Sequence, residues 1–373
     1  MRWIVIGWLA AAMCVRNAQA ADSEEQQRIA TAVEALTRMQ NVDLEEKPAV
    51  KAAVERVLEK TRGTPNFVKL VQHFQLTNQT AGLLEVAINH PTDESGVEAM
   101  RLVLAGKDLA AMRERLETTN VTNAMRLVEA LGNAKEKQVV PVIEPLVTDD
   151  QRHIEVRRAA VRALAQTQDG AASLLALARR EKLPENLKFI AASELNAARW
   201  PEIKAAAATV LPLPAAQNSQ SLPPLAELLK MKGEAARGAE VFRRETTGCI
   251  KCHQVRGEGR DLGPALSEIG TKLPKEALHE AILDPSAGIS FGFEAWQMQL
   301  KSGDEAYGLK ASETADEVAI KDTNGIITRY KKAEIASMQQ TKTSIMPSGL
   351  QQTMTTQELV DLVEYLSSLK KQP

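Results

Sequence analysis

The chain has 373 residues, enough for two or three domains, and its 46 basic side chains nearly balance 48 acidic ones. This balance excludes the strong positive charge that nucleic-acid-binding proteins use, so we expect no nucleic acid among the partners. Aromatic residues make up only 3% of the chain. The interior must therefore consist mostly of Leu, Val, Ile and Ala, which suits stacked helices.

The N-terminus has the features of a cleaved export signal. A short basic start precedes an apolar run over residues 3–15, and Ala18–Ala20 has the small-x-small form that signal peptidase cleaves. The apolar run is shorter than the roughly 20 residues that a spanning helix needs. The sequence therefore predicts a signal peptide over residues 1–20, export to the periplasm and no transmembrane segment in the mature protein. A lipid anchor on Cys14 is the alternative.

Residues 21–211 are predicted to form a succession of Ala-rich helices. Three similar segments each close a helix and are followed by a polar turn and another apolar helix: Val128–Leu131, Val161–Leu164 and Ala192–Leu195. The final leucines of these segments lie 33 and 31 residues apart. A helix pair that recurs at such an interval is typical of an α-solenoid, in which each pair buries its apolar face against its neighbours. The pattern therefore predicts HEAT-like repeats, with an ordinary helical bundle as the alternative.

A Pro-rich segment marks the clearest boundary in the chain. Prolines stand at both ends of Pro212–Pro224, and the centre of the segment is polar. Such a composition stops helices and has nothing to bury. The sequence therefore predicts a linker over residues 212–232 and a separate C-terminal domain over residues 233–373.

The C-terminal domain contains a C-x-x-C-H motif, Cys249–His253. This motif is typical of covalent c-type haem attachment, because two thiols on one short turn can each add to a haem vinyl group. The histidine that follows then supplies the proximal ligand of the iron. We therefore predict one haem c, held by Cys249, Cys252 and His253. Half of a zinc site is the alternative, although such a site needs a second Cys or His pair.

Two further features concern the surroundings of the iron. Pro264 follows the motif by eleven residues, and its carbonyl is predicted to accept a hydrogen bond from the other ring nitrogen of His253. Met346 is the candidate distal ligand, because it lies in a loop before the last helix and Pro347 stiffens the chain after it. The competing ligands are Met298, Met338, Met354 and His279.

Helices and strands of the C-terminal domain follow from residue periodicity. A helix over residues 233–246 carries Gly238 and Phe242 on one face, and a capping-box pattern at Thr355–Glu358 starts an amphipathic last helix. Between them, alternating segments predict an antiparallel sheet of about four strands, inserted at about residues 290–340. The predicted strands are Phe293–Lys301, Tyr307–Ala311, Glu317–Lys321 and Ile326–Lys331.

These features resemble the haem-binding family first recognised in planctomycete and verrucomicrobial bacteria, whose c-type domain often follows HEAT-like repeats. The resemblance rests on the sheet insertion and on six segments: Gly238–Phe242, Cys249–His253, Gly257–Gly259, Leu262–Pro264, Asp284–Ser286 and Ile345–Leu350. It implies a mainly α fold, with a HEAT-like α-solenoid followed by a class I cytochrome c-like domain that contains a small antiparallel β insertion. It also implies His253 and Met346 as the axial ligands. Longer members contain a propeller that resembles sugar dehydrogenases. The redox partner expected for this chain is a periplasmic dehydrogenase or another cytochrome.

The expected function is one-electron transfer by an exported single-haem cytochrome, with the repeats as docking surface, rather than catalysis by a self-contained enzyme. Two alternatives stay open: a peroxidase-like haem enzyme or sensor with an open sixth position, and a HEAT-type scaffold with a structural haem. Four cations either steer an acidic partner or form an ordinary solvated surface: Arg256, Arg260, Lys272 and Lys275.

Overall fold

The computed structural model describes residues 24–40, 42–106, 109–118, 120–213, 222–244 and 247–371. The predicted signal peptide lies outside these residues, as does the centre of the predicted linker. The chain forms two compact units, one ending at Ala134 and the other beginning at Lys135. The predicted domain limits stay a prediction.

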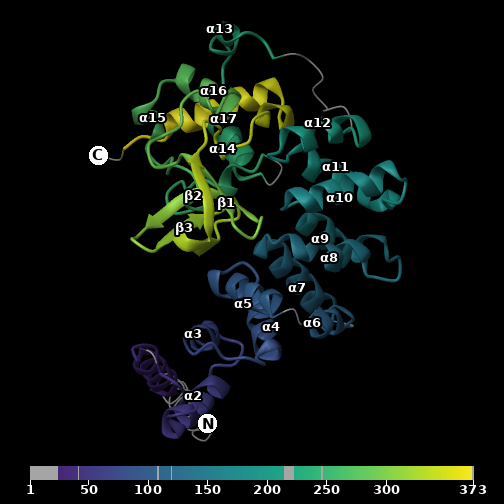
Figure 1. The fold of residues 1–373 in the computed structure, drawn as a ribbon. Coiled ribbons are helices and arrows are strands. Elements are labelled where there is room, and N and C mark those ends of the chain that lie inside the picture. The colour runs from purple at the N-terminus through teal and green to yellow at the C-terminus, as the bar shows by residue number, and fades with distance from the viewer. Residues whose placement is uncertain are drawn as a thin grey trace, which may run out of the picture. The chain divides into compact units, whose positions relative to one another are not determined.

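The first unit consists of helices whose apolar faces pack together. They are a helix over residues 24–37, α2 Pro48–Lys60, α3 Pro65–His73, α4 Thr80–Asn89, α5 Glu94–Ala105, α6 Leu109–Leu116 and α7 Val121–Ala134 (Figure 1). Pro48 and Pro65 occupy first-turn positions, where the missing backbone N–H costs no helical hydrogen bond. The core of this unit is aliphatic and includes Leu70, Leu84 and Met100.

The second unit begins with further helices of the repeat region. These are η1 Lys137–Val139, α8 Val140–Thr148, α9 Ile154–Leu164, α10 Gln168–Arg179, α11 Glu185–Asn196 and α12 Pro201–Val210. Buried Arg157 donates two hydrogen bonds to the carbonyl of Val147, which ties α9 to the end of α8. Leu164 and Leu195, which close two of the similar segments, are completely buried. Burial between neighbouring helices explains why leucine recurs at this position.

The C-terminal part of the second unit is built around two crossing helices (Figure 1). Its helices are α13 Leu225–Leu228, α14 Ala235–Arg243, η2 Cys249–Lys251, α15 Ile269–Lys272, α16 Lys275–Leu283, η3 Lys332–Glu334, η4 Leu350–Thr353 and α17 Thr356–Ser368. The predicted capping box at the start of α17 is confirmed, because the Thr355 and Glu358 side chains each accept from the other's backbone N–H. Gly238 lets α14 approach α17 closely, as predicted, since a Cβ there would lie 1.9 Å from the carbonyl oxygen of Asp361.

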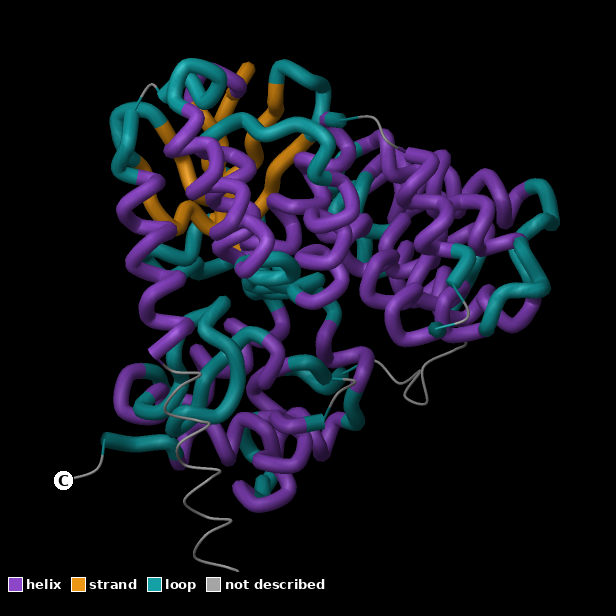
Figure 2. The backbone as a smooth tube through the Cα atoms, turned by 90° about the horizontal axis from the view of Figure 1, so that it is seen from below, coloured by secondary structure: helices purple, strands orange, loops and turns teal. Residues whose placement is uncertain are grey.

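The inserted sheet has five antiparallel strands in the order β4-β3-β2-β1-β5. Its strands are drawn in orange in Figure 2. They are β1 Ala295–Leu300, β2 Glu305–Glu313, β3 Glu317–Lys321, β4 Ile327–Lys331 and β5 Ile335–Gln340. The prediction of about four strands was therefore one short. The missed strand, β5, is an edge strand in which four of the six side chains are exposed. Its polar composition hides the alternation that marked the other strands.

The sheet contacts the repeat helices within the second unit. Lys135 Nζ lies 2.6 Å from Asp322 Oδ2, and both side chains are largely buried. Arg199 Nη2 lies 2.7 Å from Glu305 Oε2. The Arg199 guanidinium also lies 4.4 Å from the ring centroid of Trp200 and 4.8 Å from that of Tyr307. The repeats and the inserted sheet are thus joined by charge and aromatic contacts.

The structure confirms the predicted fold class, a mainly helical chain with repeats and a C-terminal antiparallel sheet. In the part of the chain that the structure describes, none of the helices has the length and apolar character needed to cross a membrane.

Candidate functional site

The motif Cys249–His253 forms a single tight turn. The backbone N–H groups of Cys252 and His253 both donate to the carbonyl of Cys249, at 3.1 and 3.0 Å. The two cysteines are free thiols and are partly buried. Burial raises the pKa of the Cys249 and Cys252 thiols above the ordinary value, which keeps them protonated. The turn therefore presents two thiols and one imidazole from five consecutive residues.

A backbone carbonyl fixes the tautomer of His253. Nδ1 of His253 lies 2.8 Å from the carbonyl oxygen of Pro264, so Nδ1 carries the proton and donates it. Burial lowers the pKa of His253 below its ordinary value, although the hydrogen bond to Pro264 opposes this shift. The imidazole is therefore neutral, with Nε2 available as a metal ligand.

The loop that carries Pro264 is held against the motif by backbone hydrogen bonds. Leu262 N and Gly263 N both donate to the carbonyl of Cys252, at 3.0 and 2.7 Å. Two residues beyond Pro264, Leu266 N donates to the carbonyl of Gln254 at 2.8 Å. These bonds place the Pro264 carbonyl beside the ring of His253.

Gly263 has a role that the sequence analysis missed. A Cβ built on Gly263 would lie 2.6 Å from Cε1 of His253 and 2.8 Å from Nδ1. No real side chain tolerates such a contact, so only glycine lets the loop lie against the imidazole. The sequence offered no signal for this contact beyond the Gly-Pro pair.

Met346 packs against the same apolar core as the motif. Met346 is half-buried and contacts this core, as do Cys249, Ile250 and Leu266. Its backbone N–H donates to Ser344 Oγ at 3.2 Å, which shapes the loop before η4. The structure thus brings the motif and the predicted distal ligand to one core.

The competing ligands lie in different surroundings. Met298 is completely buried in the core of the sheet, and Met338 packs against that same core. Met354 is buried in the same core that Cys249 and Met346 contact. His279 is 2% exposed, and its Nε2 has no hydrogen-bond partner among the described residues. Of the four competitors, His279 therefore keeps the strongest claim to a ligand role.

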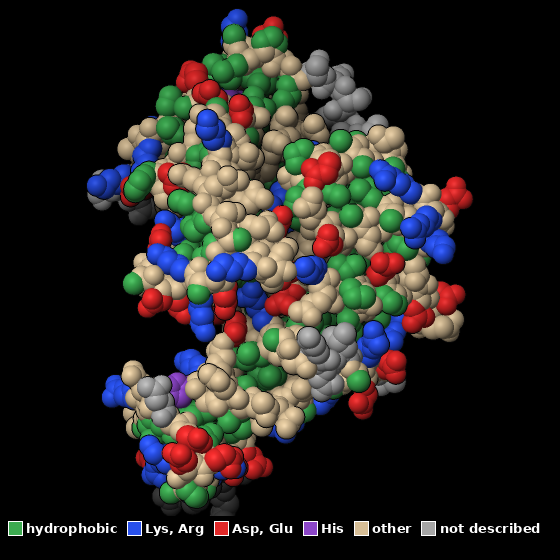
Figure 3. Space-filling view, viewed as in Figure 1, with side chains coloured by type: hydrophobic (Ala, Val, Ile, Leu, Met, Phe, Trp, Pro, Cys, Tyr) green, Lys and Arg blue, Asp and Glu red, His purple; other side chains and the backbone are tan. Residues whose placement is uncertain are grey.

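The four predicted steering cations differ in their partners. Lys275 pairs with Glu364 of α17, and Arg260 Nη1 donates to the carbonyl of Asn324 at 3.3 Å. Both Lys272 and Arg256 are exposed. On the face drawn in Figure 3, basic and acidic side chains are intermingled.

The residues of the motif fit covalent haem c. Two unpaired thiols share one turn with a neutral imidazole whose Nδ1 is already bonded, which is the donor set that haem c requires. The zinc alternative needs further ligands, and the described residues contain no cluster of three or more His, Cys, Asp or Glu side chains that could hold a metal ion.

Comparison with known proteins identifies both parts of the chain. Residues 109–196 match the model of the HEAT repeats. Residues 235–320 match the model of cytochrome c, a domain that binds haem covalently, and this match includes Cys249–His253 but ends before Met346. No curated protein matches the chain significantly. The chain therefore combines HEAT repeats with a haem-binding cytochrome c domain.

Proposed function

We propose that the protein is an exported, periplasmic cytochrome that carries one covalent haem c and passes one electron at a time between redox partners. The observation that carries this proposal is the bonded turn Cys249–His253, with the Nδ1 of His253 held by Pro264 at 2.8 Å, inside the part that matches cytochrome c. A hydrogen bond from the other ring nitrogen fixes the tautomer of a ligating histidine and raises its basicity as a metal ligand.

Each residue of the site has a distinct task in this proposal. Cys249 and Cys252 hold the group through thioether bonds, and His253 Nε2 supplies the proximal ligand. Met346 supplies the distal sulfur, which closes the sixth position to substrates and favours a high reduction potential. The bound haem supplies a reversible one-electron couple. The apolar core around Cys249 and Met346 limits the access of water.

The partner in this proposal is a periplasmic dehydrogenase or another cytochrome, and the repeats form the surface on which this partner docks. Phe189 on α11 supports a docking role, because its side chain is 69% exposed on the repeat surface. Aromatic side chains are enriched where protein partners meet. Arg256 and Lys272 are the exposed cations best suited to attract an acidic partner.

A redox titration of the full chain, expressed with a haem-attachment system, tests the electron-transfer function. We expect one reversible wave that fits a single-electron couple, no binding of carbon monoxide by the reduced protein, and no turnover of hydrogen peroxide. Carbon monoxide binding together with rapid peroxide turnover would instead establish the enzyme with an open sixth position.

The docking role needs a separate test once a partner is in hand. We expect the rate of electron transfer to fall with ionic strength, and Phe189→Ser to lower the rate more than Phe189→Leu does. A rate that is independent of salt would remove the steering role of the cations. Equal rates for the two variants would remove the repeats as docking surface.

A further inference from the structure

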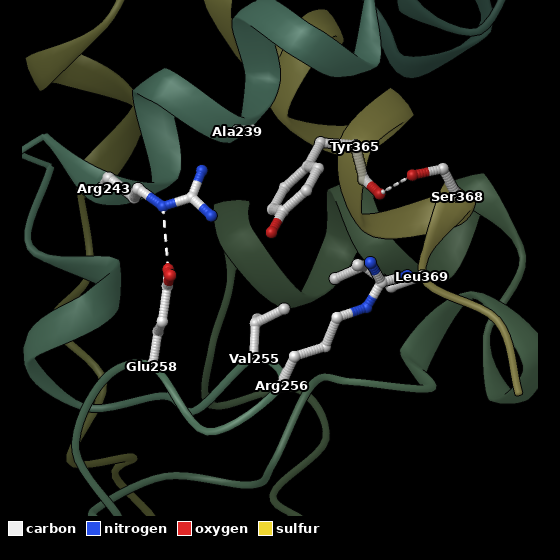
Figure 4. Close-up of a pocket in the computed structure, with 8 residues that line it drawn as sticks. All are labelled: Ala239, Arg243, Val255, Arg256, Glu258, Tyr365, Ser368 and Leu369. Atoms are coloured by element: carbon white, nitrogen blue, oxygen red, sulfur yellow. Dashed lines mark hydrogen bonds and ion pairs between the residues drawn. The ribbon is translucent and has the colours of Figure 1, made fainter. Parts of the chain in front are cut away.

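Behind the haem motif, a cavity of about 350 Å³ lies between α14, α17 and the turn that follows His253. Figure 4 shows its lining, to which α14 contributes Arg243, α17 contributes Tyr365, and the turn contributes Arg256 and Glu258. Small-ligand sites in proteins have volumes of roughly 300–1,000 Å³, so the cavity is large enough for a small molecule. None of the proposed haem ligands lines it.

The charged groups leave the cavity with an excess of positive charge. Arg243 Nε donates to Glu258 Oε2 at 3.0 Å, and Figure 4 shows the terminal nitrogens of Arg243 beyond this ion pair. Arg256 has no ion-pair partner among the described residues. The lining therefore carries two guanidinium groups and one carboxylate, and a single further negative charge would balance them. Guanidinium groups bind carboxylates through short, charge-assisted hydrogen bonds.

The backbone fixes the place of Arg256. Val255 and Glu258 exchange two backbone hydrogen bonds, at 2.9 and 3.0 Å, which closes a tight turn around Arg256. Arg256 itself has φ of 50°, in the left-handed region that is costly for a side-chain-bearing residue. Its backbone N–H donates to Ser267 Oγ at 2.8 Å. This turn holds Arg256 at the cavity.

A hydroxyl group and an apolar wall complete the site. The Tyr365 ring packs against buried Phe242, with 5.8 Å between ring centroids, and Figure 4 shows its hydroxyl pointing into the cavity. Ala239, Val255 and Leu369 supply apolar lining. A ligand that fits both kinds of lining has one negatively charged end and a short apolar end.

We propose that this cavity binds a small aliphatic carboxylate. Its carboxylate accepts hydrogen bonds from Arg243, Arg256 and the Tyr365 hydroxyl, and its alkyl chain lies against Val255 and Leu369. The proposal shares Arg256 with the proposed attraction of an acidic partner, but it does not rest on electron transfer, because it is measured by butyrate binding alone.

Calorimetric titration of the full haem-loaded chain with butyrate tests the proposal, with butyramide as the uncharged ligand of the same shape. We expect one saturable butyrate site per chain and binding of butyramide that is at least about tenfold weaker, because a charged group gains more from these donors than a neutral one. Absence of saturation, or equal binding of the two ligands, would overturn the proposal.

Two variants locate the site. Arg256→Gln removes a cation that has no partner to lose in the described fold, and we expect it to weaken butyrate binding about tenfold. Lys272→Gln removes the same charge from an exposed position on α15 and should change the affinity less than about twofold. Equal losses in both variants, or no loss in Arg256→Gln, would show that butyrate binds by net charge or elsewhere. Either result would remove the proposed site.

Discussion

At the scale of single residues, the tautomer and position of the His253 ring are set by backbone groups rather than by other side chains. Its partner is the Pro264 carbonyl, and its ring lies against the backbone of Gly263. A carbonyl partner fixes the tautomer without adding a second titrating group to the site. The protonation of His253 is therefore set by burial and by this one hydrogen bond.

Gly263→Ala is predicted to disturb this arrangement. The new methyl group would lie 2.6 Å from the imidazole, so the ring must turn and the hydrogen bond to Pro264 must weaken. A less basic imidazole stabilises the oxidised iron less, so the reduction potential should rise by about 40 mV for each 1 kcal/mol lost, by the one-electron conversion. Potentiometry measures the shift. A potential equal to that of the unmodified protein would show that Gly263 does not set the position of the ring.

At the scale of elements, the crossing of α14 and α17 organises the haem domain. Asp361 of α17 is buried and accepts hydrogen bonds from Arg237, Gln357 and the backbone N–H of Glu234. Gly238 permits the close approach that makes these bonds possible. The close packing at Gly238 and the hydrogen bonds of Asp361 therefore stabilise the same crossing of α14 and α17.

Gly238→Ala is predicted to destabilise the domain by about 3 kcal/mol, because the methyl group would overlap backbone atoms that have no room to move. Gly288→Ala is the matched control, since a Cβ at Gly288 meets nothing within 4 Å. Urea unfolding of both variants gives the two free energies. Equal stabilities would contradict the close crossing of α14 and α17.

Asp361 is also expected to make the stability of the domain depend on pH. Burial alone would raise the pKa of Asp361, but hydrogen bonds from Arg237, Gln357 and Glu234 outweigh burial and lower the pKa below 3.8. Because the folded pKa lies below the unfolded one, the stabilisation is complete above the unfolded pKa and is lost as the pH falls through the folded pKa. Urea unfolding at several acidic pH values should show this loss in the unmodified protein and a smaller one in Asp361→Asn. The same acid dependence in both proteins would exclude Asp361 as its source.

The elements that sequence predicted well are those with a strong local pattern. The capping box at Thr355, the bounds of β3 and the buried repeat leucines all follow from short-range sequence patterns. The edge strand β5 was missed because most of its side chains are exposed. Gly263 and the cavity beside Arg256 were missed because they depend on contacts between loops, which periodicity does not encode.

At the scale of the whole molecule, the second compact unit contains both repeat helices and the haem domain. The inserted sheet contacts the repeat region through Lys135–Asp322 and through Arg199, which pairs with Glu305 and stacks on Tyr307. Asp322 also accepts from the backbone N–H groups of Asn324 and Ile326. The insertion thus fastens the haem domain to its own repeats.

Lys135→Met is predicted to destabilise this unit by about 3 kcal/mol, because it leaves the buried carboxylate of Asp322 without its counter-ion. Lys188→Met is the control, since Lys188 pairs on the surface with Glu185, whose side chain is 86% exposed. Chemical unfolding compares the two variants. A loss in Lys135→Met no larger than that of the control would show that the ion pair does not hold the sheet in place.

The ligation of iron by His253 and Met346 is the central claim, and the visible and near-infrared spectrum of the haem-loaded protein tests it most directly. We predict a low-spin spectrum with a sulfur-to-iron charge-transfer band, and we predict that Met346→Ala abolishes this band. A band that survives in Met346→Ala, or a high-spin spectrum in the unmodified protein, would contradict the proposed site and direct attention to His279 or to an open sixth position.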